Sequence, residues 1–272
     1  MPLGQYVNSK GRIVIKLGGG LITNKNLYKT IDKESINNVC NTLKQLDDEG
    51  YTLIIIHGAG SYGHILSKRM NIANGINHEF HEQQINAIKE IRSNMMELND
   101  EVINSLKELG LDAIGYPPSK WAKGTGKVFT GNLDMFETNN NDKIPICFGD
   151  VVDRDDEYEF GILSGDDLMY RISMEIPNVK YTIFLLGDVD GVLTNPPNNT
   201  NAKLMEKYTK NDVITTFHSS DIDVTGGIDL KLLRAFEISK KIDNVWFLNG
   251  KRCDRIIQLI RTGTTLGTKI IP

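Results

Sequence analysis

The chain of 272 residues has few cysteines, no excess of positive charge and no long apolar run. Its cysteines, Cys40, Cys147 and Cys253, lack the spacing of metal-ligand pairs, so we expect reduced thiols in a cytoplasmic protein and no metal site built from them. A formal net charge of -4 argues against nucleic acid as a partner. No apolar run approaches the ~20 residues that cross a bilayer, and the first residues contain no apolar signal core, so neither a membrane partner nor secretion is expected.

Familiar nucleotide-binding motifs are also missing. The sequence contains no Walker A motif, no G-x-G-x-x-G after its first expected strand and no protein-kinase signature set. Residues 58–63 read GAGSYG, which has the spacing of a hydrolase nucleophile elbow without its context. We therefore interpret Ser61 as a helix cap, with a serine hydrolase as a remote alternative. If the chain handles nucleotide phosphates, it does so by another scheme.

The order of apolar segments predicts an α/β fold. The composition, 40% hydrophobic and 24% charged, is that of a globular protein, and the length allows one large domain or two fused lobes. The expected strands are Arg12–Leu17, Tyr51–His57, Ala113–Gly115, Ile144–Gly149, Tyr181–Leu186 and Asn244–Leu248. The expected helices are Lys33–Glu49, His78–Leu109, Asp166–Glu175, Gly227–Lys241 and Cys253–Thr262. This alternation predicts a three-layer αβα sandwich with a mainly parallel central sheet.

Glycine-rich clusters follow several expected strands, at the edge of a parallel sheet where ligands gather. The first, IVIKLGGG at Ile13–Gly20, ends a buried strand in three glycines, so that backbone N–H groups and the charge of Lys16 would face one anion. The second, HGAGSYGH at His57–His64, permits the same close approach, and His64 would add a side-chain donor. The other clusters are FGDVV at 148–152, LSGDDL at 163–168, GDVDGV at 187–192 and DVTGGIDLK at 223–231.

The acidic residues of these clusters have two explanations each. Asp166 and Asp167 would either cap the helix that begins there or hold lysines through charge-assisted hydrogen bonds. Asp188 and Asp190 fit a plain turn or a contact with ribose. Lys231 lies one turn inside a helix that starts with a glycine pair, which is a geometry that suits a phosphate.

The segment His78–Leu109 is long for one helix, and its apolar residues follow helical spacing. A core or dimer-forming helix explains this pattern best. The alternative is that Met95 and its neighbours line an apolar substrate pocket, because thioethers fill irregular spaces. The glycine-rich segment Ser119–Asn132 is expected to form a hairpin or a mobile flap, and residues 139–142 and 153–159 are expected to form polar turns.

The six clusters, in this order and spacing, resemble the amino acid kinase superfamily, and the resemblance spans Ile13 to Lys231. Within the superfamily the sequence looks most like the isopentenyl phosphate kinases. His64 at the end of HGAGSYGH carries that distinction, and Lys25 in ITNK points the same way. Fosfomycin kinases share the terminal Gly-His of this loop and stay the close alternative.

The resemblance implies a reaction and a set of roles. ATP, with Mg²⁺, would phosphorylate isopentenyl phosphate to isopentenyl diphosphate in a homodimeric enzyme whose acceptor-binding part is about 1–165 and whose nucleotide-binding part is about 166–272. The implied catalytic residues are Lys16, Lys25, His64, Asp166 and Lys231. The implied nucleotide-binding residues are Lys16, Gly18, Gly19, Gly60, Asp188, Gly227 and Lys231. The implied acceptor-binding residues are Ala59, Gly60, His64, Gly149, Asp150 and Gly165.

Three residues depart from the pattern of the family. Gly20 stands where a serine is usual, Ala59 where a glycine is usual, and Gly187 where a threonine is usual. Each residue is small, so we expect the phosphate cradle to survive. Besides a kinase for another small phosphate or phosphonate, a non-catalytic nucleotide-binding member of the fold is an alternative, but retention of Lys16, Lys25 and Lys231 favours turnover.

Overall fold

The computed structural model describes residues 9–24, 27–137, 143–212 and 227–272. Its centre is a sheet in the order β10-β12-β11-β9-β1-β2-β6-β3. These strands are β10 (Lys207–Tyr208), β12 (Thr268–Ile270), β11 (Asn244–Asn249), β9 (Val179–Leu186), β1 (Gly11–Leu17), β2 (Tyr51–His57), β6 (Ile144–Phe148) and β3 (Ala113–Gly115). Neighbours from β11 to β3 pair in parallel, and β12 runs antiparallel to β11. The predicted mainly parallel sheet is therefore confirmed.

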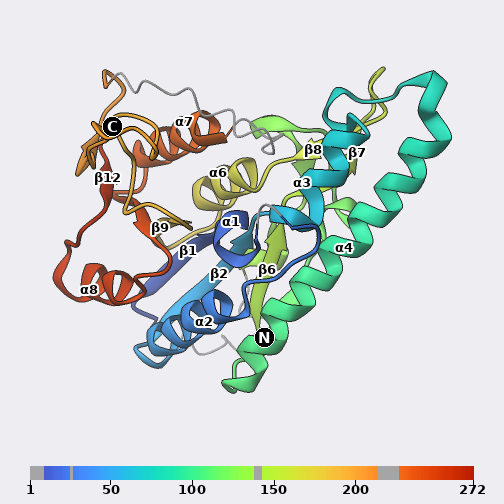
Figure 1. Ribbon diagram of the computed structural model, residues 1–272. Coiled ribbons are helices and arrows are strands. Elements are labelled where there is room, and N and C mark those ends of the chain that lie inside the picture. The colour runs from blue at the N-terminus through green and yellow to red at the C-terminus, as the bar shows by residue number, and fades with distance from the viewer. Residues whose placement is uncertain (1–8, 25–26, 138–142, 213–226) are drawn as a thin grey trace.

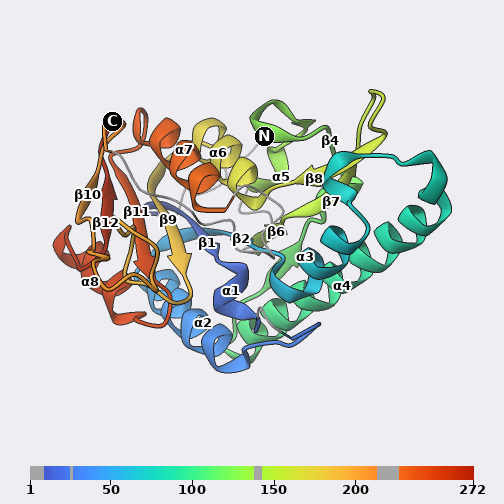
Figure 2. The same cartoon turned by 45° about the horizontal axis from the view of Figure 1, so that its top comes forward.

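Helices cover both faces of this sheet (Figures 1 and 2). The helices α2 (Lys33–Asp48), α4 (His81–Glu108) and α8 (Asp254–Thr262) lie on one face, and α6 (Gly165–Glu175) and α7 (Gly227–Ser239) lie on the other. Alternating side chains of each strand supply the two cores: Ile13 and Ile15 pack with the first set of helices, and Val14 with the second. The three-layer αβα sandwich predicted from the sequence is confirmed.

A second, four-stranded sheet in the order β5-β4-β7-β8 lies beside the main one. Its strands are β5 (Thr130–Gly131), β4 (Ala122–Lys123), β7 (Asp150–Asp153) and β8 (Phe160–Leu163). β4 and β5 are antiparallel, so the predicted hairpin within Ser119–Asn132 forms. Arg171 of α6 donates to the Phe129 carbonyl oxygen (2.8 Å), which ties this hairpin to the sandwich. The predicted turn at 139–142 lies outside the described residues. Of the predicted turn at 153–159, Asp153 ends β7 and 154–159 connect β7 to β8.

Further helical turns stand between these elements. The long segment predicted as His78–Leu109 begins as a 3-10 turn, η2 (His78–Phe80), before α4 starts at His81. The other short helical elements are α1 (Gly19–Ile22), α3 (Gly60–Arg69), α5 (Asp134–Glu137), η1 (Ile72–Asn74), η3 (Pro118–Lys120) and η4 (Gly126–Val128). In the described part of the chain, no helix combines the length and the apolar character that a membrane crossing requires.

Candidate active site

A cavity of about 170 Å³ lies at the carboxyl ends of β1, β2, β6 and β9. Its lining residues are Lys16, Gly18, Gly19, Gly20, Gly58, Ala59, Gly60, Gly63, His64, Ser67, Ile91, Met95, Gly149, Asp150, Val151, Ile162, Ser164, Gly165, Leu185, Leu186, Gly187 and Lys231. Residues of five of the six predicted clusters, and Lys231 of the sixth, meet here. The expectation that ligands gather at this sheet edge therefore leads to one defined site.

The first two glycine loops touch each other through their backbones. A Cβ atom on Gly19 would lie 2.4 Å from the Gly60 nitrogen, and one on Gly58 would lie 2.6 Å from the Gly19 nitrogen. Gly60 also has a φ of 50°, in the left-handed region that favours glycine. These positions accept only glycine without displacement of the chain, and the result is that the two predicted phosphate-binding loops are direct neighbours.

The first residues of α3 and α6, Gly60 and Gly165, both line the cavity. In these first turns the Ser61 N–H group already donates to Thr23 Oγ1 and the Asp166 N–H group to Ser164 Oγ. The positive ends of the two helix dipoles still favour an anion here. Gly18 does not add a further donor, because its N–H group donates to the Leu185 carbonyl oxygen (3.1 Å). Gly18 instead allows close backbone approach: a Cβ atom there would lie 2.6 Å from that same oxygen.

Lys16 and Lys231 share one buried carboxylate. Strand alternation places Lys16 on the same face as Val14, toward α6 and α7, where it forms an ion pair with Asp166 Oδ1. Lys231 Nζ lies 3.5 Å from Asp166 Oδ2 and donates to the Gly227 carbonyl oxygen at 2.9 Å. Of the two explanations for Asp166, holding lysines is therefore the correct one. The side chain that caps α6 is Ser164, whose Oγ accepts from the Asp166 N–H group.

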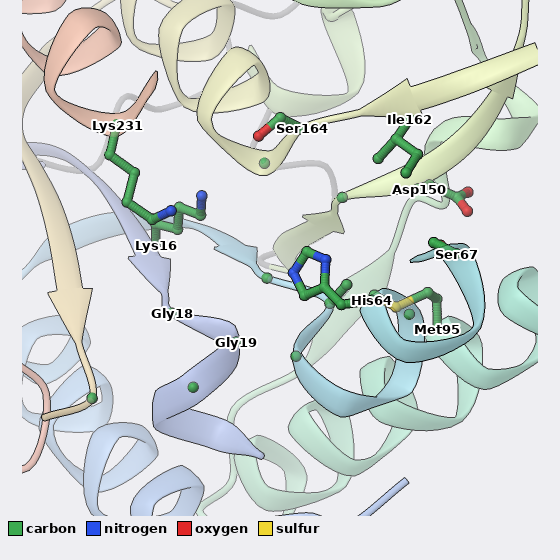
Figure 3. A pocket seen from close by; sticks show the side chains of 18 of the residues that line it. Lys16, Gly18, Gly19, His64, Ser67, Met95, Asp150, Ile162, Ser164 and Lys231 are labelled. Atoms are coloured by element: carbon green, nitrogen blue, oxygen red, sulfur yellow. The ribbon is translucent and has the colours of Figure 1, made fainter. Parts of the chain in front are cut away.

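The cavity has a cationic side and an apolar side, and His64 lies between them (Figure 3). Lys16 and Lys231 converge from β1 and α7, while His64 projects from α3. Beyond His64 the lining consists of the apolar side chains of Ile91, Met95, Val151 and Ile162, together with the polar Ser67 and Asp150. The first explanation of the long segment is correct, because α4 is a core helix, and its buried Met95 and Ile91 also line the cavity. That this lining receives a substrate stays a prediction.

Asp150 lines the same cavity with both carboxylate oxygens engaged. Its Oδ2 accepts from the Ser119 N–H group (2.9 Å) and its Oδ1 from the Val151 N–H group (2.8 Å). Burial raises the pKa of this carboxyl, although these hydrogen bonds oppose the shift. Such bonds favour a supporting role, since they hold the segment after Pro118 against β7. A direct contact of Asp150 or its neighbour Gly149 with an acceptor stays a prediction.

Some predicted residues lie elsewhere. Lys25 is outside the described residues. Asp188 and Gly227 do not line the cavity, and Asp188 Oδ1 lies 3.9 Å from Lys251 Nζ on an exposed surface. Asp190 accepts hydrogen bonds from Asn249 and Arg255.

Two sequence interpretations are wrong. Ser61 is not a helix cap: it lies inside α3, its Oγ accepts from the Thr30 N–H group (3.3 Å), and its side chain is fully buried. Asp167 does not cap α6 either, because its carboxylate pairs with Arg234 at 2.7 Å.

The sequence reasoning missed Ser67, Val151 and Ile162 as lining residues. Ser67 follows His64 by three positions on α3, so helical spacing was a usable signal for it. Val151 and Ile162 face each other across the β7–β8 pair, and no local pattern of the sequence predicts this pairing.

The chain belongs to the amino acid kinase family, whose sequence model matches residues 11–249. Two curated relatives are the isopentenyl phosphate kinase of Thermoplasma acidophilum, 28% identical over 90% of this chain and 94% of its own length, and that of Methanothermobacter thermautotrophicus, 27% identical over 84% and 87%. Among solved structures, the product complex of T. acidophilum isopentenyl phosphate kinase aligns with a TM-score of 0.78 at 26% identity, and the alignment covers 95% of this chain and 99% of that one.

Proposed function

We propose that this protein is an ATP-dependent kinase that converts isopentenyl phosphate into isopentenyl diphosphate. The observation that carries the proposal is the composition of the cavity: phosphate-binding loops and lysines on one side, His64 in the middle, and an apolar lining beyond it. A small phosphate monoester with a hydrocarbon tail matches this arrangement, because its phosphate would meet His64 and its tail the apolar lining. The curated isopentenyl phosphate kinases, similar over most of their length, support the same acceptor.

Phosphoryl transfer asks the protein chiefly to position two polyanions and to neutralise their charge. Lys16 and Lys231 supply fixed positive charge next to the glycine loop after β1, so we assign the ATP phosphates to that side. His64 is assigned to the acceptor phosphate, and Lys25 to the transferred group by family resemblance. The direction of transfer then runs from the lysine side toward His64.

No general base is required. A phosphate monoester has a second pKa of about 6, so near neutral pH its oxygen is already a competent nucleophile. Asp166 cannot take that role, because both of its oxygens face lysine ammonium groups and its side chain is 1% exposed. Its function in this scheme is to keep Lys16 and Lys231 side by side.

Mg²⁺ belongs to the proposal as a companion of the nucleotide. Within the described ranges, no group of three or more His, Cys, Asp or Glu side chains is arranged to hold a metal ion. The nearest carboxylate to the lysines, Asp166, is committed to them. We therefore propose that Mg²⁺ enters with the nucleotide and is bound chiefly by ATP phosphate oxygens.

The apolar side suits a short tail. Burying the five carbons of an isopentenyl group against Ile91, Met95, Val151 and Ile162 would contribute about 4 kcal/mol at ~0.8 kcal/mol per carbon. Asp150 and Ser67 are the polar residues next to this apolar lining. We also propose that about 1–165 form the acceptor-binding part and about 166–272 the nucleotide-binding part, with Lys16 and the glycine loop after β1 as the portion of the first part that reaches the ATP phosphates.

Steady-state kinetics with isopentenyl phosphate, dimethylallyl phosphate and fosfomycin, read by coupled detection of ADP, test the acceptor. Isopentenyl phosphate should give the highest kcat/KM, and a preference for fosfomycin would replace the proposal.

Family resemblance also leads us to propose a cytoplasmic homodimer. Light scattering would measure the mass of the protein in solution and so test the homodimer.

His64→Ala provides the sharper test of the site. The acceptor KM should rise by roughly tenfold or more, because a hydrogen bond to a charged group contributes about 1.5–3 kcal/mol, while the ATP KM stays within about twofold. His64→Gln, which retains a donor, is the matched control and should recover part of the loss. Equal losses for both substrates would remove His64 from the acceptor side.

A further inference from the structure

The two consecutive carboxylates at the start of α6 serve different partners. Asp166 faces Lys16 of β1 and Lys231 of α7 at the cavity, whereas Asp167, about 100° further around the helix, faces Arg234 of α7. There its Oδ1 accepts a hydrogen bond from Arg234 Nε at 2.7 Å. The side chains of Asp167 and Arg234 are 4% and 9% exposed, so this ion pair is shielded from solvent.

Arg234 is held from more than one direction. Its Nη1 donates to Glu237 Oε2 at 2.9 Å, and its guanidinium carbon lies 5.8 Å from the centre of the Tyr170 ring on α6. Glu237 also accepts from Lys127 at 2.5 Å, which extends the network to η4. Charge-assisted hydrogen bonds of a planar guanidinium fix direction as well as distance. The Asp167–Arg234 contact is therefore a rigid connection between α6 and α7.

Lys231 lies three residues before Arg234, so both side chains leave α7 on neighbouring parts of one face. Two ion pairs consequently join the helices side by side: Asp166 with Lys231, and Asp167 with Arg234. The first is long, at 3.5 Å, and lies at the cavity; the second is short and buried. The short pair therefore adds a directional polar contact to the apolar packing of α6 against α7, and it lies one helical turn from the Lys231 side chain at the cavity.

We propose that Asp167 and Arg234 are positioning residues that fix the first turn of α7 against the start of α6 and thereby hold Lys231 beside Lys16 at the nucleotide phosphates. The inference rests on the proposed function, since it takes the nucleotide as the ligand of Lys231. It assigns a catalytic consequence to a pair that contacts no substrate.

Asp167→Ala, Asp167→Asn and Lys127→Met test the pair. In D167A the connection is lost, and kcat should fall roughly tenfold or more, with a raised ATP KM, because ~1 Å of displacement can cost about 100-fold. The acceptor KM should stay within about twofold, since His64 and the tail lining belong to other elements. D167N keeps an oxygen that accepts from Arg234 Nε, so it should recover most of kcat. K127M breaks only the exposed end of the network and should match wild type.

A merely structural role predicts a different pattern. Melting temperatures would then fall in D167A while kcat, measured well below the transition, stayed at the wild-type value, and that result would overturn the inference. Equal losses in D167N and D167A would overturn it as well, because the geometry survives only in D167N. If D167A does not fold, Arg234→Lys replaces it: a single ammonium cannot reproduce the fork, and an unchanged kcat would contradict the proposal.

Calorimetric titration with a non-hydrolysable ATP analogue separates this inference from the proposed function. If wild type binds the analogue but does not phosphorylate isopentenyl phosphate, the proposed acceptor is wrong. Weaker binding in D167A, with recovery in D167N, would still support the positioning role in that case. Identical binding by all three proteins, together with identical kcat in an active enzyme, would refute it.

Discussion

Gly19→Ala is the most direct test of the contact between the two glycine loops. The new Cβ would lie 2.4 Å from the Gly60 nitrogen and 2.8 Å from its Cα. Relaxed contacts between such atoms are roughly 3.5 Å, so the loops must separate by about 1 Å. Neither obstacle is the end of a flexible side chain, and the displacement therefore falls on the backbone.

The consequence should appear in catalysis more than in binding. Reacting atoms must come within about 3–3.5 Å, and a misplacement of ~1 Å can cost about 100-fold in rate. Each loop keeps its own donors, so both substrates should bind with modestly changed KM. Overpacking of this kind costs about 1–3 kcal/mol of stability. We therefore expect kcat to fall about 100-fold in a protein that is still folded at 25 °C.

Coupled detection of ADP gives kcat and both KM values, and thermal denaturation gives the loss of stability. Gly110→Ala is the matched control: it lies just after α4 with a φ of 78°, and no neighbouring atom comes within 4 Å of the place that its new Cβ would take. The left-handed backbone should cost that variant about 1 kcal/mol while kcat stays unchanged. A kcat for G19A within about threefold of wild type would refute the claim that the loop contact sets the transfer geometry.

Two further variants address the acceptor side and pH. Met95→Ala removes a fully buried side chain that lines the apolar side of the cavity, at a cost of about 2–4 kcal/mol in stability. The kcat/KM for a ten-carbon acceptor should therefore rise relative to that for isopentenyl phosphate. An unchanged ratio of the two kcat/KM values would show that the tail lies elsewhere. Burial lowers the pKa of His57 from 6.5 to about 4, so the unfolded chain takes up this proton before the folded one. Above pH 6.5 this group does not lower the free energy of unfolding. As the pH falls from 6.5 toward 4, the free energy of unfolding decreases by about 3 kcal/mol in total. Urea unfolding at pH 7 and 4.5 should show this loss in wild type and a smaller one in His57→Gln; equal losses would contradict the buried, neutral state.

The sequence predicts the strand-end part of the site well because strand geometry determines it. Alternation along β1 sends Lys16 to the face of α6 and α7, and the same alternation along β2 sends His57 to the opposite face, where it stacks on Phe148. A glycine cluster at the end of a parallel strand can face only the carboxyl edge of the sheet. The positions of Lys16, Gly19 and Gly60 therefore follow from local rules and from the order of the elements.

The sequence does not predict contacts between residues that lie far apart in the chain and share no repeating pattern. Arg234 and Asp167 are 67 residues apart, and each has an ordinary surface explanation when it is considered alone. Val151 and Ile162 belong to a sheet of short strands that carry little periodicity. Only the packing of α6 against α7 brings Asp167 and Arg234 together, and only the pairing of β7 with β8 brings Val151 and Ile162 to the cavity.

The three departures from the family pattern become understandable once their places are known. Ala59 has a φ of -77° and a ψ of -32°, which any residue adopts, so a methyl group replaces the usual glycine without backbone strain. Gly20 and Gly187 both line the cavity, and a Cβ atom on Gly187 would lie 2.5 Å from the Gly20 carbonyl oxygen. These two departures are therefore one local feature, in which the chain after β9 approaches α1 more closely than a threonine would permit. Because the feature joins the segments that follow β1 and β9, next to the strand that carries Lys16, it falls on the proposed nucleotide side and leaves the proposed acceptor role of His64 unchanged.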